Sequence, residues 1–548
     1  MKHIINDDVF IHENVFPVRI VKTEGKITNP ENLLSEKELQ ITTSENNITS
    51  LCNNGKRKNA FVVLDFGKEL HGKVRLLTHT VSGAGTAEIR ITCGESVSEA
   101  LSTIDKKGAT NDHSVRDFVF PVPPYSDMSF NESGFRFVKI ELLSKKTVIN
   151  IKAITATAIY RDIPYLGSFE CSNATINKIF EVSAYTCHLN MQQYIWDGIK
   201  RDRLVWIGDM HPEMLTVRTV FGANSIIEKS LRFMRENTPL PSWMNGMPTY
   251  SLWWIVILYD WYFYTGSVDF LNENKAYALQ LTEIICKLVN DDGSDNLPSY
   301  FIDWPCNGKK AGISGSRALL AMSLTACEKL ADLYGNKALS ALCKERKNRL
   351  TSTQPQTFGA KQVAAIYSLA GWLNEEQAAD EILKNGAEGF STFMSYYLLK
   401  AASKKDMTAA LCALEEYYGG MLSMGATSFW EDFDIKWLRN ATPVDCLPEK
   451  GKKDIHADNG AFCYKGLRHS LCHGWSSAPA AFLAEEVLGI KITEAGCRKI
   501  EIKPNLGNLS FANGTYPTPY GIITVKISRT ECGIKTEYTA PKEIEIIL

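Results

Sequence analysis

The fourteen-residue segment from Trp196 to Asp209 carries the residue types in this chain best suited to chemistry. It reads WDGIKRDRLVWIGD and holds three carboxylates, three cations, two tryptophans and two glycines. Carboxylates can bond sugar hydroxyls and transfer protons, and indole faces pack on the apolar faces of pyranose rings. Charge runs are, however, more often solvated surface held by ion pairs. The segment therefore indicates either a carbohydrate site or an ion-paired loop.

Other loops with similar chemistry favour the first of these two interpretations. Each pairs a tryptophan with an acid or a histidine, and they are Phe301–Cys306, Gly425–Asp432 and Ser470–Trp475. Taken singly, each pair is equally well explained by a tryptophan that caps the core beside a solvated acid, or by a structural histidine. Their joint occurrence between helical segments far apart in sequence predicts a shared site, provided that the helices close into a ring.

The spacing of apolar residues divides the chain into regions with different hydrophobic periods. Short alternating runs between Asn59 and Arg161 predict antiparallel strands. From about Ser172 to Leu488 the period becomes helical, with a cap at Ser172-Asn173 and no fixed repeat. Strand patterns return from about Gly496. We therefore expect an all-α toroid of helical hairpins at residues 165–490, flanked by antiparallel β-sandwich domains at 1–164 and 491–548.

Composition excludes several classes of partner. The chain has 548 residues, 45% of them hydrophobic, and a formal net charge of −2, so neither nucleic acid nor an anionic membrane is indicated. No apolar run is long enough to span a bilayer, and the aromatic stretch Leu252 to Tyr264 fits a buried helix better. The start of the chain lacks a long apolar segment, which predicts a cytoplasmic protein, or a periplasmic one if the chain is a processed form.

Neither metal nor cofactor chemistry is indicated by the sequence. The fourteen cysteines form no CxxC pair, and several lie in apolar helical patterns: Cys286, Cys327 and Cys412. Buried free thiols in a reducing compartment explain them best. The ten histidines show no HExxH spacing, and no glycine-rich nucleotide fingerprint is present, so we expect no metal and no cofactor.

Two of these segments resemble a known family. The pattern D-x-x-x-R-[D/E]-x-x-x-W-x-G-D at 197–209, followed by G-A-T-x-x-W-E at 425–431, is similar to that of the α-L-rhamnosidases of glycoside hydrolase family 78. The resemblance covers nearly the whole chain from about Asn59. It implies an (α/α)₆ barrel between β-sandwiches and exo-acting hydrolysis with inversion, without a cofactor.

The resemblance also assigns roles to individual residues. It implies that Asp202 is the general acid, which protonates the leaving oxygen, and that Glu431 is the base, which activates water. Hydroxyl-binding and pocket-lining roles fall on Asp197, Arg201, Trp206, Asp209, Asp303, Trp304, Trp430 and His473.

The acid position departs from the family pattern. The acid is usually Glu, whereas Asp202 is one methylene shorter, and inversion needs carboxyl groups about 6.5–9.5 Å apart. Arg201 and Arg203 would lower the pKa of that acid, so we expect the arginines to point elsewhere and Asp197 or Asp209 to raise it. Glu213 is the reserve acid, although a first-turn helix glutamate explains it as well.

A nucleophilic pair of Cys472 with His473 is disfavoured, because sequence neighbours rarely face each other. We therefore predict a glycoside hydrolase that removes terminal α-L-rhamnose, since an apolar wall of Trp206 and Trp304 would accept the methyl group of a 6-deoxy sugar. A glycosidase for another terminal sugar, or a carbohydrate-binding homologue with little turnover, remains an alternative. The aglycone, the linkage and the oligomeric state stay open.

Overall fold

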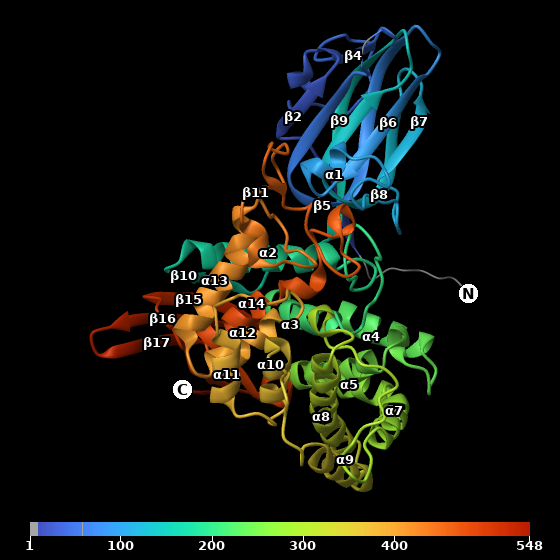
Figure 1. The fold of residues 1–548 in the computed structure, drawn as a ribbon. Helices are drawn as coiled ribbons and strands as arrows, with labels where there is room; N and C mark the ends of the chain where they lie inside the picture. The colour runs from blue at the N-terminus through green and yellow to red at the C-terminus, as the bar shows by residue number, and fades with distance from the viewer. Residues whose placement is uncertain (1–8, 57) are drawn as a thin grey trace.

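The computed structural model describes residues 9–56 and 58–548, and its first part is an antiparallel sheet (Figure 1). Its strands follow the order β3-β4-β9-β5-β8-β6-β7, with β1 on β9 and β2 on β5. Their alternating residues enclose an apolar core, as the sequence pattern predicts. The strands are β1 (Phe10–Val15), β2 (Arg19–Glu24), β3 (Lys26–Thr28), β4 (Thr49–Asn53), β5 (Phe61–Ser82), β6 (Ala87–Gly94), β7 (Asp117–Val122), β8 (Asp127–Leu142) and β9 (Thr147–Arg161).

The helical part follows this sheet. Apart from α1 (Val97–Leu101), which lies within the sheet region, its helices are α2 (Ala174–Asn190), α3 (Met210–Val220), α4 (Ile226–Asn237), α5 (Pro248–Thr265), α6 (Val268–Glu273), α7 (Lys275–Lys287), α8 (Lys310–Leu333), α9 (Lys337–Leu350), α10 (Lys361–Leu369), α11 (Glu375–Leu383), α12 (Ser395–Ser403), α13 (Met407–Ser423) and α14 (Pro479–Phe482). Packing contacts run from α2 to α3, α5, α8, α10, α12 and α13, and then back to α2.

Local sequence explains where these helices begin and how they pack. Asn173 caps α2, because its side chain accepts hydrogen bonds from the backbone N–H groups of Thr175 and Ile176. The predicted aromatic helix is confirmed as α5, and its Trp253 and Trp254 are buried, as expected for a helix that is apolar all round. Among the described residues, no helix combines the length and the apolar character that a membrane span requires.

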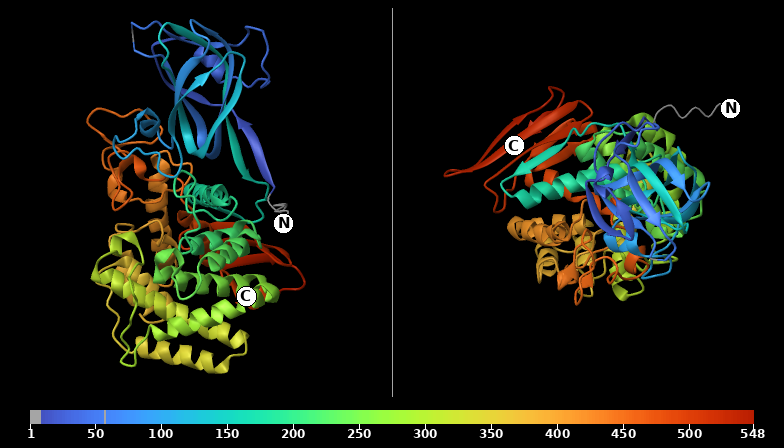
Figure 2. Two further views of the ribbon diagram at one scale, coloured as in Figure 1. Left: turned by 90° about the vertical axis from the view of Figure 1, so that its right-hand side faces the viewer. Right: turned by 90° about the horizontal axis from the view of Figure 1, so that it is seen from above.

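The remaining strands flank the helices (Figure 2). One sheet has the order β10-β15-β16-β17, and a smaller one has the order β13-β14-β18. The strands are β10 (Ser168–Cys171), β13 (Ile490–Glu494), β14 (Lys499–Ile502), β15 (Phe511–Thr518), β16 (Gly521–Thr530), β17 (Gly533–Thr539) and β18 (Glu545–Ile547), beside the short pair β11 (Ala441–Thr442) and β12 (Lys453–Asp454). Because β10 precedes the helices and pairs with β15, both ends of the helical segment meet this sheet.

The predicted burial of the helical cysteines is confirmed for Cys286 and Cys327 and wrong for Cys412, which is exposed. Cys412 lies on α13, on the face of that helix that turns away from its neighbours. An apolar sequence pattern does not distinguish this face from the buried one when small residues such as alanine surround it.

Candidate functional site

The loop between α2 and α3 holds the opening segment in a tight reversal. Asp197 is tied to Leu204 twice, since its Oδ1 accepts a hydrogen bond from the Leu204 N–H at 2.9 Å and its own N–H donates to the Leu204 carbonyl at 3.1 Å. Asp202 and Arg203 have left-handed φ angles of 56° and 53°. The chain therefore turns back at these two residues and places the Asp202 side chain at the tip of the loop, where it is 16% exposed.

The first and fourth sequence segments lie together at the start of α3. Asp209 accepts a hydrogen bond from the Tyr250 hydroxyl at 2.8 Å, and its other carboxylate oxygen lies 3.3 Å from His473 Nε2. His473 is placed there by its neighbour, because the Gly474 N–H donates to the Asp197 carbonyl at 2.7 Å. Asp197, Asp209 and His473 thus form one buried cluster.

Glu431 joins this cluster from the loop after α13. Its N–H donates to the Ser470 carbonyl at 3.0 Å, and its Oε2 accepts from the Ser470 N–H at 3.1 Å. Its own carbonyl accepts from Trp475 Nε1 at 3.0 Å. Oε1 pairs with Arg201 and lies 3.9 Å from His473 Nδ1. Glu431 is therefore held rigidly, with one oxygen directed at the opening segment.

Arg201 bridges the two residues that the resemblance assigns as acid and base. Its Nη1 lies 3.0 Å from Asp202 Oδ1, and its Nη2 pairs with Glu431. The expectation that both arginines point elsewhere is therefore wrong for Arg201. It holds for Arg203, whose guanidinium donates to backbone carbonyls of Glu132 and His113. The guanidinium compensates the charge that two nearby carboxylates would otherwise leave uncompensated in a buried site.

The carboxyl groups of the site differ sharply in their proton affinities. Burial would raise the pKa of Glu431, but Arg201, and after it His473 and His469, outweigh burial and lower this pKa to about 2. Burial, reinforced by neighbouring carboxylates, raises the pKa of Asp197 and of Asp209. One carboxylate of the site therefore stays ionised beside two others that favour the protonated form.

The second sequence segment lies beside the third. Asp303 accepts hydrogen bonds from the Trp304 N–H at 2.8 Å and from the Ser391 hydroxyl, and burial raises its pKa to about 7. Burial, and next the charges of Asp303 and Glu431, also raise the pKa of Asp432 to about 7. The interaction of Asp303 with Asp432 connects this segment to the site.

The tryptophans divide into partly exposed and buried members. Trp206 is partly exposed and meets Tyr250 edge to face, with ring centroids 6.0 Å apart. Trp304 is also partly exposed and stacks on Phe462 at 5.9 Å. Trp430 is 1% exposed and packs among aromatic rings, so in this structure it supports Glu431 from the core. Its predicted contact with substrate stays a prediction.

Glu213 lies in the first turn of α3 and is fully buried. A Cβ at Gly474 would lie 1.4 Å from its Oε1, so only glycine allows this close approach. Burial, followed by the charges of Asp209 and Asp197, raises its pKa well above the usual value. Burial also raises the pKa of the Cys472 thiol, which disfavours a nucleophilic thiolate there.

Several residues near the site carried no signal in the sequence analysis. The Tyr250 hydroxyl donates to the Asp209 carboxylate, yet a tyrosine in an apolar helix looks ordinary in sequence. Ser470 begins a segment that we singled out, but its backbone N–H, which donates to Glu431, has no counterpart in the sequence pattern. Asp432 belongs to a segment that we singled out, but its raised pKa depends on Asp303, more than a hundred residues away. His113 comes from the antiparallel sheet region, which gave no reason to connect it with the site.

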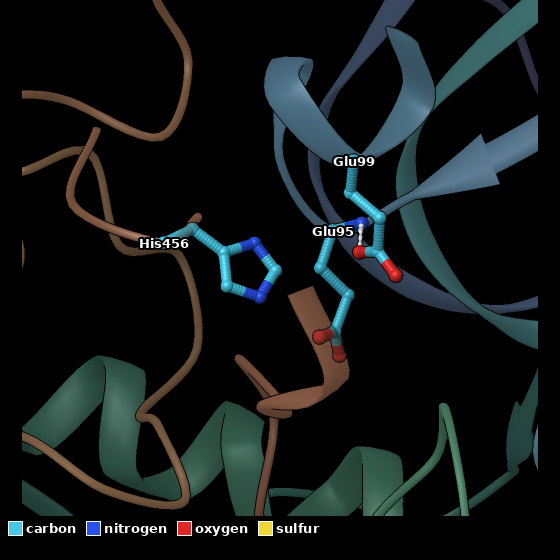
Figure 3. Close-up of side chains that lie close together, drawn as sticks. All are labelled: Glu95, Glu99 and His456. Atoms are coloured by element: carbon cyan, nitrogen blue, oxygen red, sulfur yellow. Dashed lines mark hydrogen bonds between the residues drawn. The ribbon is translucent and has the colours of Figure 1, made fainter. Parts of the chain in front are cut away.

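A second buried cluster lies between the sheet and the helices (Figure 3). Side-chain ligand atoms of Glu95, Glu99 and His456 lie within 4.8 Å of one another. The Lys200 ammonium is 2.9 Å from Glu95 and 3.3 Å from Glu99, and both His456 nitrogens already contact Ser96 or a carbonyl. Because Lys200 supplies the positive charge, these residues fit an ion-pair cluster that anchors the opening segment better than they fit a metal site.

A cavity of about 710 Å³ lies elsewhere. It begins at His211 and follows α3 and α12 to Arg218 and Lys404, and its lining includes neither Asp202 nor Glu431. The four converging sequence segments define the candidate site, because cavity size alone does not identify chemistry. Its Asp197, Asp209 and Glu431 are buried.

Comparison with known proteins gives consistent matches. The model of the bacterial alpha-L-rhamnosidase 6 hairpin glycosidase domain matches residues 164–487. An alpha-L-rhamnosidase from Alteromonas sp. (strain LOR) is 26% identical over 471 residues, which cover 76% of this chain and 48% of that protein. The chain therefore spans about half the length of this relative.

Solved structures agree in fold. A family 78 rhamnosidase of Bacillus sp. GL1 has a TM-score of 0.74 at 22% identity, covering 90% of this chain and 53% of that chain. A rhamnosidase from Klebsiella oxytoca with rhamnose bound has a TM-score of 0.67 at 17% identity. The match covers 87% of this chain and 96% of that chain. At these identities the structural likeness establishes the fold alone.

Proposed function

Because the chain belongs to the bacterial α-L-rhamnosidase six-hairpin glycosidase family, we propose that it hydrolyses terminal α-L-rhamnosides by an exo-acting, inverting mechanism. We further propose that its helices form an (α/α)₆ toroid at residues 165–490, with β-sandwich domains at 1–164 and 491–548. The closed succession of helix contacts from α2 back to α2 supports the toroid.

The observation that supports the mechanism best is the convergence of Asp202 and Glu431 on Arg201 from distant parts of the chain. In the proposed reaction Glu431 takes a proton from water, the water oxygen attacks the anomeric carbon, and Asp202 protonates the departing oxygen. The low pKa of Glu431 keeps it ionised before the reaction, as a base must be.

Substrate must reorganise the ion pairs. Arg201 now occupies the positions facing both carboxylates, so sugar hydroxyls or the attacking water would have to displace part of its contacts. Asp197 and Asp209 would bind hydroxyls, and Trp206 and Trp304 would contact the ring and its methyl group. The paired state of both carboxylates also favours one alternative, a homologue that binds sugar and turns it over slowly.

The first experiment measures release of 4-nitrophenol from 4-nitrophenyl α-L-rhamnopyranoside, beside a panel of other terminal glycosides, with Glu431→Gln as the control. Turnover of the rhamnoside that disappears in the control supports the proposal. Turnover of a different glycoside, also lost in the control, keeps the site and changes the sugar. Sugar binding without turnover supports the binding alternative. Proton NMR of the first anomer released tests inversion, since a retained anomer contradicts it.

A further inference from the structure

A loop of the antiparallel sheet region reaches the candidate site. Residues 102–116, between α1 and β7, contact the loops that precede His473. Lys107 lies 2.7 Å from Asp458, the Leu467 N–H donates to the Lys107 carbonyl at 2.7 Å, and Arg468 lies 2.6 Å from Asp112. These long-range contacts fix the loop in place on the helical part of the protein.

The side chain of His113 in this loop lies between two carboxylates. Its Nδ1 is 2.8 Å from Asp202 Oδ1, and its Nε2 is 3.0 Å from Asp112 Oδ1. Its carbonyl also accepts a hydrogen bond from Arg203 at 3.3 Å. Both ring nitrogens therefore contact carboxylates and the backbone carbonyl accepts a hydrogen bond. One of the two carboxylates is that of Asp202, the candidate acid.

The two oxygens of Asp202 are in different situations. Oδ1 has two nitrogen neighbours, His113 Nδ1 at 2.8 Å and Arg201 Nη1 at 3.0 Å. Oδ2 accepts no hydrogen bond from any residue that the structure describes. One oxygen is thus held by the protein, and the other is left for a ligand.

Backbone geometry indicates that this contact is imposed by tertiary structure. His113 has a φ of 62°, beside 56° for Asp202 and 53° for Arg203. Left-handed backbone is uncommon for residues other than glycine, costs of order 1 kcal/mol or more, and concentrates at functional sites where the surroundings over-determine it. Three such residues in mutual contact therefore require a strong external constraint.

We propose that His113 is a positioning residue for Asp202, which it holds by Oδ1 so that Oδ2 faces the leaving oxygen of the substrate. The inference rests on the proposed role of Asp202 as the acid. An aspartate reaches less far than the glutamate usual at this position, so an anchor from outside the helical domain fixes where its free oxygen lies. The sheet region then completes the site, because the segment at 164–487 alone does not contain His113.

The kinetic test depends on the leaving group. 4-Nitrophenolate departs with little protonation, whereas methoxide needs the acid. We expect His113→Ala to lower kcat for methyl α-L-rhamnopyranoside by about 10–100-fold, and to change kcat for the 4-nitrophenyl glycoside by about threefold or less. A merely structural role would lower both rates alike, so equal losses, or no loss on either substrate, would overturn the proposal.

Two further variants separate the side chain from the backbone. His113→Asn keeps a residue that tolerates left-handed backbone and offers an amide N–H near the position of Nδ1, so it should recover most of the rate. His12→Ala, at an exposed position in β1, is the matched control and should change neither rate. Failure of Asn to recover any activity, with the fold intact by circular dichroism, contradicts the proposed contact.

A measurement independent of turnover keeps this inference separate from the proposed function. The charged groups that face His113 are Asp112, Asp202, Arg201, Arg203 and Arg468. NMR signals of the His113 ring nitrogens should shift in Asp202→Asn, because the carboxylate that contacts Nδ1 is replaced by an amide. Unchanged ring signals overturn the contact. If the wild type hydrolyses no rhamnoside but the ring signals shift, the proposed function fails and the contact stands.

Discussion

Two buried ion-pair networks in this protein have opposite balances of charge. Around Glu485, in the π-helical turn after α14, each carboxylate oxygen has a cation: Arg218 at 2.5 Å on Oε1 and Lys400 at 2.6 Å on Oε2, with the Tyr396 hydroxyl also at 2.6 Å. Burial opposes ionisation, but Lys400 and Arg218 outweigh it and hold the pKa of Glu485 far below its usual range. Two cations therefore pair with this one carboxylate.

Around Glu431 acids outnumber cations. Arg201 pairs with both Glu431 and Asp202. Asp197, Asp209 and Glu213 have raised pKa values, and among the described residues none of the three forms an ion pair with a lysine or an arginine. A fold that needed only stability would pair these groups or replace them by apolar residues. Unneutralised carboxyl groups with perturbed pKa values are instead typical of functional sites.

The largest expected effect separates the two networks by activity. Glu431→Gln should lower kcat on the 4-nitrophenyl rhamnoside by about 10³-fold, because a general base contributes about 10²–10⁴. The matched variant Glu485→Gln should keep kcat within about threefold, since its network contacts no candidate site residue. Initial-rate kinetics on both proteins test this. A similar loss in the two variants would remove the distinction.

Stability should respond in the opposite order. Glu485→Gln leaves the largely buried Arg218 guanidinium without its carboxylate and Lys400 with only Glu486 at 3.9 Å, which costs about 3 kcal/mol and lowers Tm by several degrees. Glu431→Gln removes one acid where acids are in excess, and Arg201 keeps Asp202, so the loss should be smaller. Thermal unfolding at pH 7 measures both. A larger loss for Glu431→Gln is the result that contradicts the comparison.

Gly474 tests the acid-rich cluster sterically. Gly474→Ala places a Cβ 1.4 Å from the present position of Glu213 Oε1, so the glutamate or the neighbouring His473 must move. We expect kcat to fall about tenfold, since small displacements of catalytic groups are costly. Adding Glu213→Ala makes room and should recover part of the rate. No recovery in the double variant means that the collision is not the cause.

The pH dependence of stability should also change at one carboxyl group of the second sequence segment. Burial raises the pKa of Asp303 to about 7 in the folded protein, whereas the carboxyl ionises near pH 4 in the unfolded chain. Between these two pH values the folded protein therefore holds a proton that the unfolded chain has lost. The stability from this group is therefore complete below about pH 4 and is lost as pH rises through about 7. Asp303→Asn should flatten the decline of stability, followed by thermal unfolding between pH 4 and 8, by up to about 4 kcal/mol, which is what a shift of about three pKa units represents. An unchanged profile shows that Asp303 ionises freely.

Much of the secondary structure could be predicted because local chemistry specifies it. The cap at Asn173, the apolar helix α5 and the alternating strands of the first sheet depend on residues a few positions apart. The types of the candidate site residues could also be predicted, since Trp, Asp and Glu in four loops indicate sugar chemistry. Which of these residues form ion pairs with one another could not be predicted, because it depends on contacts across the fold.

The sequence by itself determined which groups are available: carboxylates at 197, 202, 209 and 431, their arginine neighbours, and the helices and strands between them. Only the tertiary structure decided that Arg201 bridges Asp202 and Glu431, that Lys200 turns to Glu95, and that His113 comes from the sheet to hold Asp202. The reason is physical. Proton affinity and ion pairing depend on burial and on distances of a few ångströms, which arise only when segments hundreds of residues apart pack together.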